Sequence, residues 1–288
     1  MKSNFEAWIL LIPLVVVLYL MIWRPTATGI IWSFYRMQGY TPTEFIGFRN
    51  YYEVIKDAQF IPTLLNTVEY VVWSLVIGYI PPVIIAVMIN EMVHFKNGFK
   101  ITIYLPAVIP IVAALLMWSY IYYPDASGLL NMILGKFGIP PYIWLNDEHF
   151  TIPLLMITST WHAFAATMVL YYAALQGISS EMYEAAIIEG AGIFRRFWHV
   201  TIPQLSGILL LTLVSQIIGV FQIMQEPMVM TGGGPNNASL SVGYQIYRYG
   251  FVNGRAGHAL ALGGIVFVIL LVFTFFYFIL DKKVQENY

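Results

Sequence analysis

The chain has 288 residues, of which 59% are hydrophobic and only 10% are charged, against about 25% charged in an ordinary soluble domain. A soluble fold of this size could not bury so much apolar surface, so the composition excludes a soluble globular protein. The formal net charge of −1 argues against a partnership with nucleic acid. The absence of cysteine excludes disulfides, thiolate metal sites and cysteine nucleophiles.

Six stretches are long and apolar enough to cross a membrane as helices, since a span needs about 20 mainly apolar residues. Strands of a membrane barrel would be about 10 residues long and would alternate in polarity. We therefore predict an all-α, polytopic membrane bundle that forms one domain over residues 1–288. The predicted spans are residues 7–34, 62–90, 101–123, 151–177, 203–228 and 257–280.

The first stretch is predicted to be a retained span, because Lys2 alone precedes it and no small-residue cleavage site of a signal peptide follows. In the second span, Pro81 and Pro82 are expected to break the hydrogen-bond ladder and kink the helix.

The distribution of basic residues gives only weak information about orientation. An even number of spans places both termini on one side of the membrane. If that side is the cytoplasm, the 14 Lys and Arg residues divide equally between inside and outside segments. The inside segments are about half as long as the outside ones. The positive-inside rule therefore favours this orientation only because basic residues are denser in the inside segments.

Two outside segments carry the 3.6-residue apolar period of short surface helices. One is residues 129–137, and the other contains Phe48, Tyr51, Tyr52 and Ile55. Anchoring at the membrane surface and docking of a partner are equally good interpretations of these helices.

A compact charged segment at 178–202 separates the fourth and fifth spans. Ser180 is expected to cap a helix over residues 182–189, and Gly190 to end it in the left-handed conformation. A second short helix is expected over 193–200, before Pro203 opens the next span. Small residues around the turn would let another protein surface approach the backbone, inside a charged rim of Glu184, Glu189, Arg195 and Arg196.

The stretch 184–203, "EAAIIEGAGIFRRFWHVTIP", resembles the EAA motif of binding-protein-dependent ABC importer permeases. Glu189 stands where the family more often has Asp, and Ile202 where it has Leu. "TGGGP" at 231–235, "GLLN" at 128–131 and "LPAVIP" at 105–110 resemble the maltose-type carbohydrate branch of that family, as do "NYYEVIKDAQF" at 50–60 and "WLND" at 144–147. The matching motif residues are Glu184, Ala185, Ala186, Gly190, Ala191, Phe197 and Pro203.

The resemblance implies a type I ABC importer permease fold in a bacterial cell membrane, with both termini cytoplasmic. It implies that residues 184–191 and Pro203 form a cytoplasmic element seated in a groove of an ATPase subunit. The implied partners are a second homologous permease, two copies of the ATPase and an extracytoplasmic solute-binding protein that delivers a sugar or oligosaccharide.

The chain itself carries no G-x-x-x-x-G-K-[ST] phosphate loop. Lysine does not follow the glycines at 232–234, and the next residue is Pro235. ATP is therefore expected to be hydrolysed by a separate subunit, with no cofactor or metal bound by this chain. The five histidines are scattered and no HExxH occurs, so an enzyme is not predicted.

Polar side chains inside spans are costly in lipid, which makes them functional candidates. The fifth predicted span carries Gln216, Gln222 and Gln225, followed by Glu226. On an unbroken helix with 100° per residue, Gln222 and Gln225 lie about 60° apart, whereas Gln216 points away from Gln225. We therefore predict that Gln222, Gln225 and Glu226 line a substrate path and that Gln216 bonds a neighbouring helix.

Trp161 in the fourth span and Glu69 in the second are further candidates for the path. Aromatic faces suit the C–H faces of sugar rings, and carboxylates suit sugar hydroxyls. Each residue also has a structural interpretation. Trp161 would pack against a neighbouring helix, and Glu69 would pair with a partner subunit. The neighbouring His162 equally well bonds another helix.

Three alternatives stay open at this point. A permease for a glycerol phosphate or another polar solute would share the same motifs. A stand-alone secondary transporter would favour an internal repeat or ion-binding carboxylates near the bilayer centre. An intramembrane enzyme would need grouped catalytic side chains.

Overall fold

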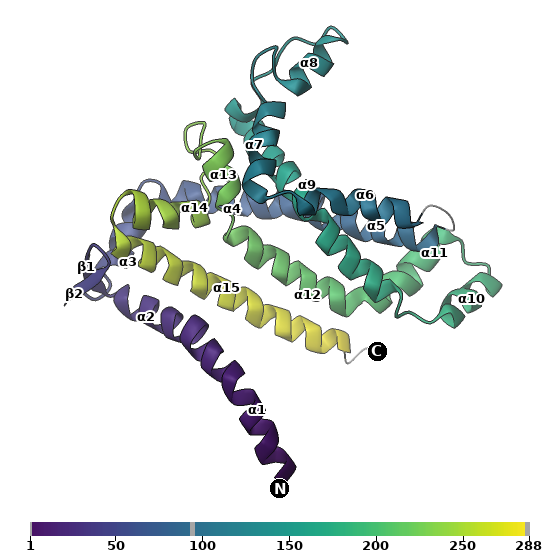
Figure 1. Cartoon of the computed structure of the whole chain (residues 1–288), viewed down its shortest axis with the longest axis horizontal. Coiled ribbons are helices and arrows are strands. Elements are labelled where there is room, and N and C mark those ends of the chain that lie inside the picture. The colour runs from purple at the N-terminus through teal and green to yellow at the C-terminus, as the bar shows by residue number, and fades with distance from the viewer. Residues whose placement is uncertain (1, 93–95, 286–288) are drawn as a thin grey trace. The chain divides into compact units, whose positions relative to one another are not determined.

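The computed structural model describes residues 2–92 and 96–285, so the ends of the predicted domain and residues 93–95 lie outside the described part. The chain divides into two compact units, one of residues 1–61 and 245–269 and one of residues 62–244 and 270–288. Each unit is described by itself below (Figure 1). The single-domain organisation stays a prediction.

The first unit contains an N-terminal helix, a two-stranded hairpin and a short helix. Its β-strands pair antiparallel, with Tyr35 opposite Phe45 and an irregularity between Arg36 and Met37. The sequence did not predict this hairpin. The elements are α1 (Lys2–Leu18), a π-helical turn (Tyr19–Trp23), α2 (Arg24–Trp32), β1 (Tyr35–Gln38), β2 (Thr41–Phe45), α3 (Arg49–Lys56), a π-helical turn (Arg248–Val252) and the start of α15 (Ala256–Gln285).

A buried asparagine holds the first unit together. Asn50 of α3 donates from Nδ2 to the carbonyl oxygens of Ser33 (2.7 Å) and Tyr35 (2.9 Å), which fixes α3 against the chain that joins α2 to β1. A Cβ on Gly257 would lie 2.9 Å from the Asn50 amide, so only glycine lets α15 approach so closely. The predicted short helix around Tyr52 is thereby confirmed, with Phe48, Tyr52 and Ile55 exposed.

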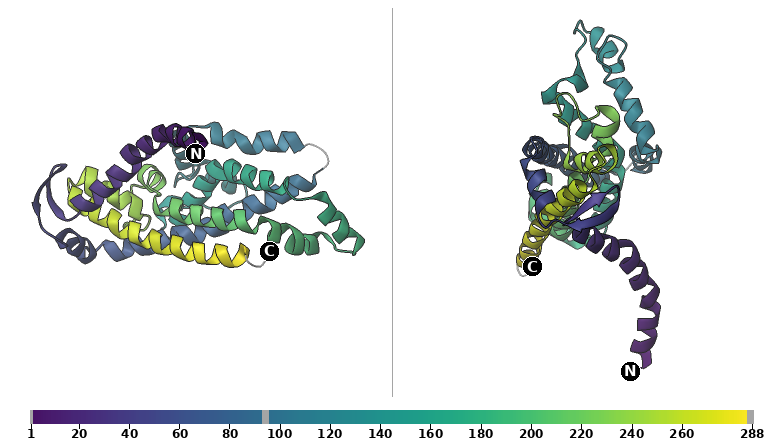
Figure 2. Two further views of the ribbon diagram at one scale, coloured as in Figure 1. Left: turned by 90° about the horizontal axis from the view of Figure 1, so that it is seen from below. Right: turned by 90° about the vertical axis from the view of Figure 1, so that its left-hand side faces the viewer.

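The second unit is a helical bundle built around α9. Figure 2 shows α9 and α12 as teal and green ribbons within this bundle. Its elements, with α4 and α14 beginning or ending in the first unit, are α4 (Phe60–Trp73), a π-helical turn (Ser74–Tyr79), α5 (Ile80–Glu91), α6 (Lys96–Val108), α7 (Ile111–Ile121), α8 (Leu129–Gly135), a 3₁₀ turn (Trp144–Asn146), α9 (Glu148–Leu175), α10 (Ser180–Ile188), α11 (Ile193–Arg196), a π-helical turn (Phe197–Thr201), α12 (Ile202–Phe221), α13 (Gln225–Met230), α14 (Val242–Tyr247) and the rest of α15.

The prediction of about six membrane spans is confirmed, since the described residues contain five or six candidate spans. A sixth span exists if α6 and α7 count as one, although this pair is bent by 101°. The bend falls at Ile109 and Pro110, where proline cannot donate the hydrogen bond that would continue α6. Among the described residues the five long apolar helices are Leu10–Trp32, Phe60–Glu91, Glu148–Leu175, Ile193–Met230 and Ala256–Ile279.

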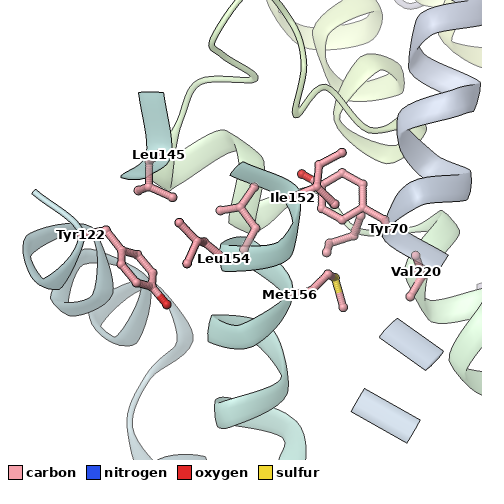
Figure 3. Packing of buried hydrophobic residues seen from close by; sticks show 9 residues of the cluster. Tyr70, Tyr122, Leu145, Ile152, Leu154, Met156 and Val220 are labelled. Atoms are coloured by element: carbon pink, nitrogen blue, oxygen red, sulfur yellow. The ribbon is translucent and has the colours of Figure 1, made fainter. Parts of the chain in front are cut away.

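Two apolar clusters pack against α9 at different heights along its length. Figure 3 shows the first, in which Ile152, Leu154 and Met156 of α9 meet Tyr70 of α4 and Val220 of α12. The second surrounds Met168 and Tyr171 farther along α9 and includes Leu205 of α12. Because α9 is buried at both levels, α4, α5 and α12 are held by one central helix.

Pro81 and Pro82 lie in the first turn of α5, directly after the π-helical turn Ser74–Tyr79. Proline is tolerated in a first turn because its missing N–H has no partner there. The predicted break in the hydrogen-bond ladder therefore takes the form of a π-helical turn.

Asn131 of α8, only 2% exposed, organises the loop that precedes α9. Its Nδ2 donates to the carbonyl oxygens of Tyr123, Asp125 and Tyr142 at 3.0–3.1 Å. Its Oδ1 accepts from the N–H of Tyr142 (3.0 Å) and from Nε1 of Trp144 (2.7 Å). One side chain thus joins both ends of the loop.

We expect Asn131→Ala to open the loop 123–146, because several buried polar groups lose their partner at about 1–3 kcal/mol each. Limited proteolysis of the membrane-embedded protein should cut within this loop at least about tenfold faster. Asn146→Ala, in the same loop but exposed, is the control and should leave the cutting rate unchanged. Equal cutting in both variants would contradict the assignment.

The start of α9 is capped by Asp147, whose Oδ1 accepts from the N–H of His149 at 2.8 Å. Hydrogen bonds from the Tyr142 hydroxyl and from that N–H hold the pKa of Asp147 below its usual range. The carboxylate also favours the positive end of the helix dipole. This cap fixes where the loop ends and the span begins.

Candidate functional site

The segment between α9 and α12 forms a helical hairpin at the opposite end of α12 from α13 (Figures 1 and 2). Its first helix, α10 (Ser180–Ile188), begins two residues before the predicted range 182–189, and its cap lies one residue earlier than predicted. The cap is Ser179, whose Oγ accepts from the N–H of Glu181 at 3.3 Å, and Ser180 is the first helical residue. Either serine suits the position chemically, so the sequence could not decide between them.

Gly190 ends α10 as predicted, with φ of +77°. The N–H of Ala191 donates to the carbonyl oxygen of Ala186 and that of Gly190 to Ile187, both at 2.9 Å. These two bonds are the Schellman pattern, which satisfies the last carbonyls of a helix. A Cβ added at Gly190 would meet nothing within 4 Å, so the turn is open on its outer side.

The predicted coupling residues gather around this turn. Glu184, Ala185 and Glu189 are exposed, and Ala186 and Ala191 are half-buried. Large apolar side chains are exposed beside them, including Ile188 at 85% and Phe194 at 83%. We call the following five residues the hairpin face: Ile187, Ile188, Ile193, Phe194 and Trp198.

The second arm of the hairpin is not the separate short helix that the sequence predicted. From Ile193 the chain runs through α11 and a π-helical turn into α12 without leaving a helical conformation. Pro203 therefore lies inside a continuous helix, in the first turn of α12, where the π-helical turn before it accommodates the missing N–H.

Hydrogen bonds tie this arm to the rest of the second unit. The hydroxyl of Tyr183 in α10 lies 3.1 Å from that of the buried Thr201. Farther along α12, Thr212 and Tyr171 of α9 are joined by their hydroxyls at 2.8 Å. Hairpin, α9 and α12 are thus mechanically connected by side-chain bonds as well as by the chain.

A polar cavity of about 440 Å³ lies where α12 ends, between α9, α12 and α13. Ser159 of α9 donates to Oε1 of Glu226 at 2.8 Å across it. Gln222 and Gln225 are exposed on its wall. The predicted path residues Gln222, Gln225 and Glu226 are therefore brought together.

Gln216 also lines this cavity, which contradicts the prediction that it points elsewhere. That prediction assumed an unbroken helix, whereas α12 ends at Phe221 and α13 begins only at Gln225. The break turns Gln222 and Gln225 toward the side on which Gln216 already lies. Ser159 was missed altogether, because a serine in a span usually bonds its own helix and gives no signal in the sequence.

The remaining candidates lie outside the cavity wall. Trp161 packs edge to face with Trp118 at 5.6 Å, which supports the packing interpretation. Glu69 is exposed and accepts from Nε1 of Trp73 one turn along α4 at 3.3 Å. His162 bonds the carbonyl oxygen of Ile109 at 2.8 Å, at the bend between α6 and α7.

The loop that follows "TGGGP", residues 236–241, is tied to α4 near the cavity. Asn66 donates to the carbonyl oxygens of Asn237 (2.8 Å) and Leu240 (3.1 Å), and the Tyr70 hydroxyl donates to Ser239 at 2.9 Å. Ser241 in turn donates to the carbonyl oxygen of Ile223 at 2.6 Å. These bonds support the broken segment that carries Gln222.

Within the described residues no group of three or more His, Asp or Glu is arranged to hold a metal ion. The polar groups of the cavity are amides, hydroxyls and one carboxylate. Such a set suits hydrogen bonding to a polar solute.

A family model described as the inner membrane component of binding-protein-dependent transport systems matches residues 78–286. The chain is 31% identical over 252 residues to AraP, the permease protein of an arabinooligosaccharides transport system of Bacillus subtilis. The alignment covers 86% of this chain and 79% of AraP. It is 30% identical over 278 residues to YurN, a probable ABC transporter permease protein of the same organism, with 95% and 94% covered.

A similar fold occurs in a bacterial alginate ABC transporter, solved in complex with an alginate pentasaccharide-bound periplasmic protein. The TM-score is 0.86 at 22% identity, with 99% of this chain and 96% of that chain covered. The predicted ABC importer permease fold is thereby confirmed.

These matches exclude two of the three alternatives drawn from the sequence, the enzyme and the stand-alone transporter. The chain is a transport subunit rather than an enzyme, and ATP is hydrolysed by a partner ATPase. A stand-alone secondary transporter is set aside for the same reason. The chain belongs to the family of binding-protein-dependent transport system inner membrane components, and it is a multi-pass inner-membrane permease of an ABC importer.

Proposed function

We propose that this chain forms half of the translocation pathway for a sugar or oligosaccharide, which an extracytoplasmic binding protein delivers. The second half is a homologous permease, and two ATPase copies drive the pair. The observation that carries the proposal is the continuous helix from the exposed hairpin face to the cavity that Gln216, Gln222 and Gln225 line.

The hairpin face has the composition of a docking surface. Ile188 and Phe194 are more than four-fifths exposed, which costs solvation free energy unless a partner or lipid covers them. The charged side chains around them, with Glu184 exposed on α10 and Glu189 exposed directly after it, favour an aqueous protein partner over lipid tails. A groove on the ATPase is the partner of the required kind.

The continuous helix provides a route for the motion. A ligand shifts a two-state equilibrium only by its differential affinity for the two states. Closure of the ATPase pair on ATP would supply that difference at the hairpin, and α12 would carry it to the cavity. The bonds Tyr183–Thr201 and Tyr171–Thr212 keep hairpin, α9 and α12 moving together.

The cavity suits a polyhydroxylated solute. Amide groups both donate and accept, and a carboxylate accepts, so the wall can match hydroxyl groups in several orientations. AraP, which is similar over most of its length, belongs to an arabinooligosaccharides transport system. This likeness supports a sugar or oligosaccharide as the solute.

The proposal places the hairpin and both termini in the cytoplasm. The chain contains no cysteine, so single-cysteine variants Ile188→Cys and Phe194→Cys can be labelled without background from this subunit. In inverted membrane vesicles stripped of the ATPase, an impermeant maleimide should label both cysteines. In vesicles that retain the ATPase, a bifunctional reagent should cross-link both to it. Phe137 is exposed directly after α8. The variant Phe137→Cys should be labelled in intact cells and not in inverted vesicles.

Assembly with the ATPase must protect the two hairpin cysteines while leaving Phe137→Cys reactive. Labelling of the hairpin from outside the cell, or full reactivity in the assembled transporter, would contradict the proposed coupling role.

A further inference from the structure

The cavity beside α13 carries charge of one sign only. Among the described residues that line it, Glu226 is the single ionisable side chain, and the polar remainder consists of Ser159, Ser215 and three glutamines. A solute that passes here therefore meets one negative charge without a compensating cation on the wall.

The position of this carboxylate is fixed. Glu226 lies in the first turn of α13. Its Oε1 accepts from Ser159 at 2.8 Å, which ties it to α9. A fixed charge on a cavity wall acts on every solute at the same place, whereas a mobile side chain could turn aside.

We propose that Glu226 is a charge filter, which disfavours anionic solutes such as uronates, sulfonated sugars and glycerol phosphates relative to neutral and cationic sugars. This inference rests on the proposed function, because a filter requires the cavity to be part of the path. The alginate transporter with the same fold imports an acidic polysaccharide, so the fold does not decide the charge of the cargo and the lining side chains must.

The filter is tested with small charged probes rather than with an unidentified sugar. Gln222→Cys places a thiol on the cavity wall in the cysteine-free chain. In the assembled transporter with its ATPase and binding protein, we compare its rate of modification by a cationic trimethylammonium and an anionic sulfonate methanethiosulfonate. The ratio of the two rates reports the charge of the cavity, because changes in the reactivity of the thiol affect both reagents equally.

Adding Glu226→Gln should lower the cation-to-anion rate ratio about four- to ninefold, since a nearby unit charge in water changes each rate about twofold to threefold in opposite directions. Glutamine keeps the shape and can still accept from Ser159. Ser159→Ala, which frees the carboxylate from α9 but keeps its charge, should lower the ratio by less than Glu226→Gln does. Moving the acid by one residue, in Gln225→Glu with Glu226→Gln, should restore it.

A cysteine at Phe137 is the matched reference, and its rate ratio should not respond to Glu226→Gln. Modification of Gln222→Cys with an unchanged ratio in Glu226→Gln would overturn the filter and leave the proposed pathway standing. No modification of Gln222→Cys in any nucleotide state, with normal labelling at Phe137→Cys, would overturn the pathway itself.

Discussion

Gly190→Trp is expected to reduce ATP-driven uptake to below about a tenth of the wild-type rate. The turn at Gly190 is open inside this chain, since an added Cβ meets nothing within 4 Å. A large side chain there would project toward whatever covers the hairpin face. Loss of a central interface contact costs about 2–4 kcal/mol, which weakens seating of the ATPase by about 30-fold or more.

The backbone conformation provides the control. Gly190 has φ of +77°, and asparagine tolerates this region better than other residues with a side chain. Gly190→Asn should keep most of the uptake, whereas Gly190→Trp should lose it at equal membrane abundance. Co-purification of the ATPase with the permease measures seating directly. If the ATPase still co-purifies with Gly190→Trp and uptake stays normal, the coupling role is refuted.

The sequence predicted the hairpin well because its signals are local. A glycine in the left-handed region, small residues on both sides and a serine cap each act within one helical turn. The cap was placed one residue too late, and the junction was wrong, since a continuous helix through Pro203 depends on a π-helical turn over Phe197–Thr201. That turn leaves the pattern of apolar residues intact, so periodicity cannot detect it.

The cavity was predictable only in part. Gln222, Gln225 and Glu226 stood out as polar residues in an apolar span, but the helical wheel excluded Gln216. The only proline close to the break after Phe221 is Pro227 of α13, which cannot donate to the carbonyl oxygen of Ile223 and so gives a partial local signal. The break also depends on long-range bonds from the loop that follows "TGGGP", such as Ser241 to Ile223, and on the approach of α14. Tertiary contacts of this kind are invisible to local patterns.

The positions of the spans were predictable because lipid requires long apolar helices. The hairpin β1–β2 was not, since its strands are short and mostly exposed. The bend between α6 and α7 could have been suspected from Pro106 and Pro110, which stand only four residues apart. Proline alone does not give the angle, because the bend also depends on the bond from His162 to Ile109.

Gly243→Ala is expected to disturb the cavity more than any other small change near it. A Cβ at Gly243 of α14 would lie 2.6 Å from the carbonyl oxygen of Ile223 and 2.9 Å from the carbonyl group of Gln222. These are backbone atoms, so no side chain can turn away to make room. The segment between α12 and α13 must shift, at a cost of about 1–3 kcal/mol.

This shift would move Gln222 and strain the Ser241–Ile223 bond, so the wall of the cavity would lose its shape. We expect uptake to fall about tenfold and the melting temperature of the purified transporter to drop by several degrees. Gly207→Ala in α12 is the control, because its added methyl group meets nothing within 4 Å and alanine favours helix. If Gly243→Ala behaved like Gly207→Ala in both measurements, the close approach of α14 would not shape the cavity. Because the clash involves only backbone atoms at the helix break, a selective loss in Gly243→Ala would tie the geometry of that break to transport.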